Sequence, residues 1–165
     1  MREYYFRDLQ AGDVEAIAAR MRFEDRRELK RWTGKTPLES MQEAARLADV
    51  IKIGCWKDGT ILAAFGAKRL NLLEREGCIW ALSTEEANAH KLTFARASKE
   101  GMRLVMDALD DMEVFYNYVD AEYERCIKWI EWLGGSISAR GAFAGRYGGR
   151  FLQFIIWPAG GARHT

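Results

Sequence analysis

A strand-like run followed at once by an amphipathic helix constrains the fold of this chain more than any other feature. Residues 112–119 are aromatic and β-branched, as expected of a buried strand. Residues 123–133 then show helical periodicity, and Gly134-Gly135 ends the predicted helix. Its inward positions are Cys126, Ile127, Ile130 and Leu133. This alternation is typical of a mixed α/β domain with a central sheet.

The first half of the chain extends the same pattern. Residues 4–9 read as a strand, and Asp13 is a suitable N-cap for the helix that follows. The charged stretch 23–31 fits either a helix or a surface loop. Thr36, with Pro37 and Glu39 after it, forms a capping box that predicts a helix to about residue 49. Residues 50–68 predict a β-hairpin around the tight-turn pair Asp58-Gly59.

The second half completes the predicted sheet. Residues 78–82 read as a strand, and Ser83 with Glu86 offers a second capping box before a long helical segment. Residues 136–139 and 151–157 predict a closing pair of strands, joined by a flexible loop over 140–150. We therefore expect one domain over residues 1–158, with six to seven strands, about four helices and a flexible tail at 159–165.

Composition excludes several classes of protein. With 165 residues, 48% hydrophobic and 30% charged, the chain can bury a core and is not a disordered segment. A formal net charge of +1 gives no general attraction to nucleic acid or membrane. The scattered cysteines, Cys55, Cys78 and Cys126, predict buried free thiols and neither a disulfide framework nor a metal site. We expect a soluble protein of the cytoplasm, because no apolar leader or membrane-spanning run is present.

The order of elements from Tyr4 to Trp157 resembles the GNAT N-acetyltransferase fold. The helix of that family reads N-x-x-A-I-x-x-Y-x-x-L-G-F, and here Cys126, Ile127 and Leu133-Gly134 take the matching positions. The runs Cys78-Ile-Trp-Ala-Leu-Ser-Thr and Asn117-Tyr-Val-Asp also look like a small acetyltransferase-like family of tailed phages, of the internal virion protein type. The resemblance implies an α/β (α+β) fold and, for an active member, acetyl-CoA as the acyl donor.

The sequence departs from the GNAT pattern at two places. The family binds the coenzyme A pyrophosphate with a Q/R-x-x-G-x-G/A turn, whereas residues 82–91 here contain no glycine and two acids. The family's proton-donating tyrosine is replaced by Ile130. Tyr123 stands at the family's asparagine position and is one of the nearby tyrosines that could donate a proton instead.

Several side chains are candidates for chemistry. Glu85 or Glu86 could act as the general base, or could simply cap the helix and complement its dipole. Arg96 and Lys99 share a helix face and could grip a phosphate, or could form a solvated basic face. Leu82, Ser83 and Asn117 are expected to line the cofactor cleft, with Tyr123 as a third catalytic candidate.

Two functions follow from the resemblance. The first is a GNAT-fold phage-type protein without catalysis, which binds a virion or host protein during particle assembly and needs no cofactor. The alternative is an acetyl-CoA-dependent N-acetyltransferase acting on an amine of a small molecule or protein. Binding of nucleic acid through the arginines of residues 140–150 is a third idea, which the net charge does not favour. The sequence indicates no membrane partner and no particular oligomeric state.

Overall fold

The computed structural model describes residues 2–158, except for the side chains of residues 139–143. At its centre lies one seven-stranded sheet with the order β1-β2-β3-β4-β5-β7-β6. The strands are β1 Tyr4–Asp8, β2 Val50–Trp56, β3 Ile61–Asn71, β4 Glu76–Ser83, β5 Val114–Asp120, β6 Ser136–Ala144 and β7 Arg150–Ile156. β4 and β5 pair in parallel, and all other neighbours pair antiparallel.

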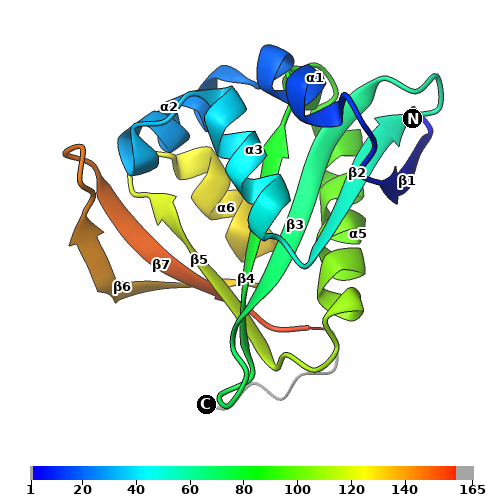
Figure 1. Ribbon diagram of the computed structural model, residues 1–165. Helices are drawn as coiled ribbons and strands as arrows, with labels where there is room; N and C mark the ends of the chain where they lie inside the picture. Colours follow the sequence, from blue (N-terminus) through cyan, green and yellow to red (C-terminus); the bar gives the residue numbers. More distant parts are fainter. Residues whose placement is uncertain (1, 159–165) are drawn as a thin grey trace.

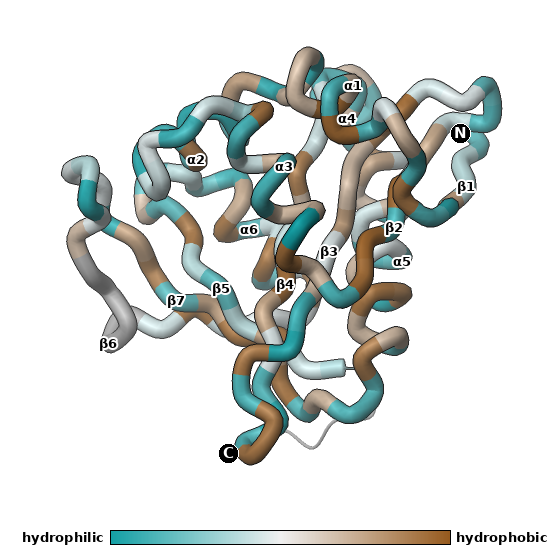
Figure 2. The backbone as a smooth tube through the Cα atoms, in the orientation of Figure 1, coloured by the Kyte–Doolittle hydropathy of each residue, from teal (hydrophilic) through white to brown (hydrophobic). Residues whose placement is uncertain are grey.

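Helices cover both faces of this sheet (Figure 1). They are α1 Asp13–Arg20, α2 Phe23–Thr33, α3 Pro37–Leu47, the single turn α4 Glu86–Ala89, α5 Lys91–Ala108 and α6 Glu124–Trp132. The larger core lies between the sheet and α5 with α6, around Phe65, Val105 and Phe115. A smaller core joins the other face to α1 and α3, around Ile17 and Met41. The apolar residues Leu72 and Leu73 remain exposed at the tip of the β3–β4 turn (Figure 2).

The sheet opens between its two central strands. The β4–β5 ladder has only three paired positions, from Glu76–Val114 to Cys78–Tyr116. At this closed end the strands are in close contact, since a Cβ on Gly77 would lie 2.7 Å from the Phe115 ring. β5 pairs with β7 from Phe115 to Asp120, but its pairing with β4 ends at Cys78. The upper ends of β4 and β5 therefore diverge, and α6 is visible between them (Figure 1). We call this opening the β4–β5 split.

Most of the predicted elements are confirmed. The Thr36 hydroxyl accepts the Glu39 backbone N–H at 3.2 Å and caps α3, as its capping box predicts. The β2–β3 hairpin turns at Gly59, whose φ of +93° suits glycine. The described chain contains six helices instead of about four, because stretch 23–31 lies within α2 and α4 forms a separate turn.

Three local predictions were wrong. Ser83 does not cap a helix: it is the last residue of β4, and α4 has no side-chain cap. Gly12, rather than Asp13, is the N-cap of α1, and the Asp13 carboxylate pairs with Arg7 instead. The loop predicted over 140–150 is shorter, because β6 continues through Ala144 and pairs with β7 again there, after a register shift between Ser138 and Phe143. The tail predicted at 159–165 lies outside the described residues, and no described helix is long and apolar enough to cross a membrane.

Candidate functional site

Two cavities meet at the β4–β5 split. The first, of about 350 Å³, lies mainly between α2, α3 and the strands β3 to β5, and we call it the α2–α3 cavity. Its wall includes Glu28, Leu29, Trp32, Ser40, Lys68, Trp80, Leu82, Asn117 and Tyr118. The second, of about 290 Å³, lies between α4, α5 and α6, and we call it the α5–α6 cavity. Cys126 and Trp129 belong to both walls, so the two spaces adjoin through the opening in the sheet.

The α5–α6 cavity combines apolar rings with positive charge. The rings of Phe94 and Trp129 stack with centroids 6.4 Å apart. Three cationic side chains belong to the same wall, those of Arg22, Lys91 and Arg125. Arg22 pairs with Asp25 and Arg125 with Glu24, whereas Lys91 has no ion pair among the described residues. Lys91 also begins α5, an 18-residue helix whose first turn has no side-chain cap. Because the uncapped N–H groups and the helix dipole add positive potential, this cavity is suited to an anionic ligand with an apolar portion.

An acid from α2 holds the open end of β4. Asp25 is buried, and its carboxylate accepts the Ser83 backbone N–H at 2.8 Å. The same carboxylate accepts hydrogen bonds from Arg22 Nε at 3.0 Å and from the Tyr123 hydroxyl at 3.3 Å. Asp25 thus joins α2, β4 and the start of α6 around the split.

A second acid from α2 faces the open end of β5. Glu28 Oε2 accepts the Asp120 backbone N–H at 3.0 Å, and Glu28 forms no ion pair with any side chain that the structure describes. The pKa of Glu28 is raised to about 8, first by burial and then by the nearby Asp25 and Asp120 carboxylates, while the hydrogen bond from the Asp120 N–H opposes this rise. A carboxyl group with this pKa can exchange a proton near neutral pH, which suits a general base.

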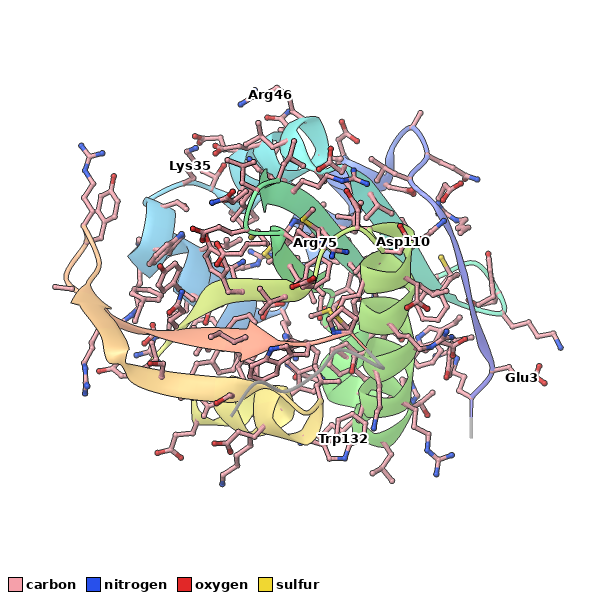
Figure 3. The ribbon with its side chains drawn as sticks, turned by 90° about the horizontal axis from the view of Figure 1, so that it is seen from below. Glu3, Lys35, Arg46, Arg75, Asp110 and Trp132 are labelled. Atoms are coloured by element: carbon pink, nitrogen blue, oxygen red, sulfur yellow. The ribbon has the colours of Figure 1, made fainter. Side chains whose placement is uncertain are left out.

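Aromatic rings line the α2–α3 cavity beside Glu28. Trp32 stacks on Tyr118 with ring centroids 5.3 Å apart and meets Phe151 edge-on at 4.7 Å. Ser40 lies in the same wall, and its buried hydroxyl has no hydrogen-bond partner in the described part of the chain. Lys35, labelled in Figure 3, is paired with Glu43 at the rim. The cavity is therefore mostly apolar, with a few polar groups at defined places.

Four of the sequence-predicted residues lie at the split. Asn117 spans it: its side-chain N–H donates to the Ile79 carbonyl at 2.9 Å, where backbone pairing has stopped. Leu82 lines the α2–α3 cavity, and Tyr123 lines the α5–α6 cavity. Burial, and next the Asp25 charge, raise the pKa of Tyr123, so its hydroxyl stays protonated. Ser83 contributes its backbone N–H and a buried hydroxyl without a partner among the described residues.

The other four lie outside both cavity walls. Glu85 is exposed and pairs with Arg20. Glu86 points to β2, where it accepts the Trp56 indole N–H at 2.7 Å. Burial alone would raise the pKa of Glu86, but hydrogen bonds from Trp56 and Arg20 outweigh it and lower the pKa. Glu86 therefore holds its charge in a structural network.

The basic pair predicted on the long helix also points away from the split. Arg96 and Lys99 are exposed residues of α5. The Lys99 ammonium lies 4.9 Å from the centre of the Trp132 ring, on the outer surface where α5 and α6 are adjacent (Figure 3). Cations do line the α5–α6 cavity, but they are Arg22, Lys91 and Arg125.

Sequence reasoning missed the acids of α2. Asp25 and Glu28 lie within a charged stretch that fits a surface loop as well as a helix. Their spacing of three residues places them on one helix face, which is the signal that was available. Their role depends on the backbone N–H groups of Ser83 and Asp120, which are distant in sequence.

Known structures share this architecture over nearly the whole chain. A GNAT-family acetyltransferase from Bacillus anthracis matches with a TM-score of 0.66 and 10% identity, covering 95% of this chain and 96% of its own. This chain has the GNAT acetyltransferase fold. A spermidine N-acetyltransferase chimera from Vibrio cholerae and hSSAT matches at 0.68 with 15% identity, over 93% and 95% of the two chains.

One GNAT-fold neighbour was solved with ligands. The Vibrio cholerae spermidine N-acetyltransferase in complex with CoA and spermine matches with a TM-score of 0.64 and 14% identity, covering 93% of this chain and 95% of its own. No family model and no curated protein sequence matches this chain. Nothing in the comparisons supports the resemblance to a phage virion family, while several neighbours are named as acetyltransferases.

Proposed function

We propose that this protein is an acetyl-CoA-dependent N-acetyltransferase. The observation that carries the proposal is the passage through the sheet: a basic, partly aromatic cavity on one face adjoins an apolar cavity with a carboxyl group on the other. Such an arrangement brings an anionic acyl donor and an amine together at the split from opposite faces. The GNAT fold of the chain and the CoA-bound neighbour support this use of the cleft.

The α5–α6 cavity fits coenzyme A despite the missing glycine turn. Lys91 and Arg125, with the uncapped first turn of α5, would hold the phosphates. Arg22 stays paired with Asp25 and forms part of the wall. The stacked Phe94 and Trp129 rings would contact the less polar arm that leads to the sulfur. In this proposal cationic side chains replace the backbone amides that a glycine turn presents elsewhere in the fold.

The exposed edge of β4 would position the acyl group. The Ile79 carbonyl and the Ser83 N–H both point into the split, so strand alternation places the N–H and C=O of Ala81 there as well. β5 no longer pairs with β4 at this level, which leaves these two groups open to a ligand. The Ala81 N–H would then donate to the acyl oxygen as negative charge develops on it.

Glu28 is the general base in this proposal. Acetyl-CoA supplies a thioester whose acyl carbon is attacked by the amine and whose sulfur leaves. Glu28 accepts one proton from the incoming ammonium and passes it to water. As the N–C bond forms and the C–S bond breaks, the nitrogen loses its second proton and the sulfur gains one. The Tyr123 hydroxyl, which donates to Asp25 in this structure, would turn from Asp25 to donate a hydrogen bond to the leaving sulfur. One proton is released per ammonium consumed.

Calorimetric titration with acetyl-CoA tests the donor site. We expect saturable binding, and we expect Lys91→Glu and Arg125→Glu each to weaken it about tenfold or more by repelling the phosphates. Arg103→Glu is the matched control, because Arg103 lies on the exposed side of α5 and pairs with Asp107. Absence of binding at millimolar acetyl-CoA would refute the proposed function.

The same titration distinguishes two phosphate sites. If Arg96 and Lys99 hold the phosphates, as the sequence-based alternative has it, Arg96→Ala and Lys99→Ala will weaken binding and Lys91→Glu will not. Our proposal requires the reverse order of effects.

A further inference from the structure

The α2–α3 cavity has an ionisable side chain without an ion pair at each end, among the residues that the structure describes. Glu28 lies at the open end of the split, where it accepts the N–H of Asp120, the last residue of β5. Lys68 of β3 lies at the closed end, because its strand partner Cys78 is paired in turn with Tyr116 of β5. Lys68 forms no ion pair with the side chains that the structure describes. A ligand that fills the cavity would therefore meet a carboxyl group at one end and an ammonium at the other.

The separation between these ends can be estimated from the strands. Asp120 is four residues beyond Tyr116 on β5. At the usual rise of a strand, this corresponds to roughly 13 Å. Lys68 also lies two strands away from β5, and its long side chain can reach back over part of that distance. The Glu28 carboxyl group and the Lys68 ammonium are thus separated by roughly 10–15 Å.

The middle of the cavity is apolar. The stacked Trp32 and Tyr118 rings form one side, and Leu29, Leu47 and Trp80 add further apolar surface. The paired Lys35 and Glu43 at the rim add no net charge. A polar or cationic linker would be poorly solvated in this section, whereas an alkyl or aromatic body would bury its surface there.

We propose that the acceptor is a primary amine joined through an apolar body to an anionic group, with its amine at Glu28 and its anion at Lys68. This inference rests on the proposed function, because it names the substrate class of the same site. It also separates this chain from its polyamine-binding neighbour: a diamine would place a second cation against Lys68.

Three amines of equal length test the inference. These are 8-aminooctanoate, octylamine and 1,8-diaminooctane, whose far ends are anionic, neutral and cationic. Acetyl transfer is followed by release of the coenzyme A thiol. We expect kcat/KM to fall in that order, by about fivefold to tenfold between the first and the last. Equal rates for the three amines, or a preference for the diamine, would overturn the inference.

Lys68 variants provide the internal check. Lys68→Met keeps the length of the side chain and should equalise 8-aminooctanoate and octylamine, while Lys68→Glu should reverse the preference toward the diamine. Lys57→Glu, on the exposed β2–β3 turn, is the matched control and should leave the order unchanged. A preference for the anionic amine that survives Lys68→Glu would contradict the assignment of Lys68.

Binding measurements separate failure of this inference from failure of the proposed function. The three amines are titrated by calorimetry, with and without saturating coenzyme A. If acetyl-CoA does not bind, the proposed function fails, and the order of amine affinities still decides the acceptor class. If acetyl-CoA binds but 8-aminooctanoate binds no better than the diamine, the acceptor inference fails alone. Absence of binding by all three amines also overturns it.

Discussion

At the scale of single residues, Glu28 makes the stability of the fold depend on pH. Its pKa is raised from 4.5 to about 8 in the folded chain, chiefly by burial. The folded state therefore keeps a proton that the unfolded state loses. This contribution is complete below pH 4.5 and is lost as pH rises to 8. Glu28→Gln removes the titration but keeps an acceptor for the Asp120 N–H.

We therefore expect wild type and Glu28→Gln to have similar Tm values at pH 4.5. At pH 8.5 the variant should be more stable by about 2 kcal/mol, or roughly 4–8 °C in Tm. Thermal unfolding across this pH range measures the difference. Glu43→Gln, at the paired rim position, is the control and should bring no such gain at pH 8.5. A parallel pH dependence of Tm in wild type and Glu28→Gln would show that Glu28 titrates normally.

Among the residues of the candidate site, some were predictable from the sequence and others were not. Asn117 was predictable because an amide within a buried strand needs a partner, and it has one in the Ile79 carbonyl. Glu28 was not, because its hydrogen-bond partner is the backbone of β5, about ninety residues later, and no local pattern shows that its side chain is buried. Glu86, which the sequence suggested as a general base, lines neither cavity. Its carboxylate is bonded instead to Trp56, on a strand that is distant in sequence.

At the scale of elements, α2 holds the open end of the split through a buried ion pair. Arg22 and Asp25 have side chains only 12% and 6% exposed. We expect Asp25→Asn to lower the free energy of unfolding by about 3 kcal/mol, because it leaves the Arg22 charge buried without a counter-ion. Urea unfolding measures this loss. The exposed pair of Arg27 and Glu122 gives the control: Arg27→Met should cost under about 1 kcal/mol.

A double variant tests the physical reason for that loss. Arg22→Met with Asp25→Leu removes both charges, and it should recover part of the stability lost in Asp25→Asn. If Asp25→Asn is as mild as Arg27→Met, α2 does not hold the split in the way described.

Elements were predicted best where the signal is local. The Thr36 cap and the Asp58-Gly59 turn each depend on a few adjacent residues, and both are confirmed. Stretch 23–31 was ambiguous because two of its acidic side chains accept hydrogen bonds from the backbone N–H groups of β4 and β5. No local pattern in the sequence shows these long-range contacts. The predicted Ser83 cap was wrong for the same reason. The Ser83 N–H donates to the Asp25 carboxylate, and Ser83 remains part of β4.

At the scale of the whole molecule, the sheet consists of two parts joined at a narrow seam. β1 to β4 form one part, and β5, β7 and β6 form the other. Their strands pair at three ladder positions, and the Asn117 side chain and α2 connect them at the open end. A cleft that admits a ligand through the sheet requires such a seam, because a complete ladder would close it. The order of elements predicted this sheet, but the length of the β4–β5 ladder depends on pairing that sequence periodicity does not encode.

Asn117→Ala tests how the two parts are coupled. The variant leaves the Ile79 carbonyl without its donor, and we expect it to cost about 1–2 kcal/mol. Because both parts border the same seam, amide hydrogen exchange should accelerate together in residues 79–83 and in residues 117–120. Asn71→Ala is the control: Asn71 holds the β3–β4 turn through the N–H groups of Leu73 and Glu74, so exchange should accelerate there alone. If hydrogen exchange in Asn117→Ala accelerates only in β5, the Asn117 side chain stabilises its own strand and does not couple the two parts of the sheet.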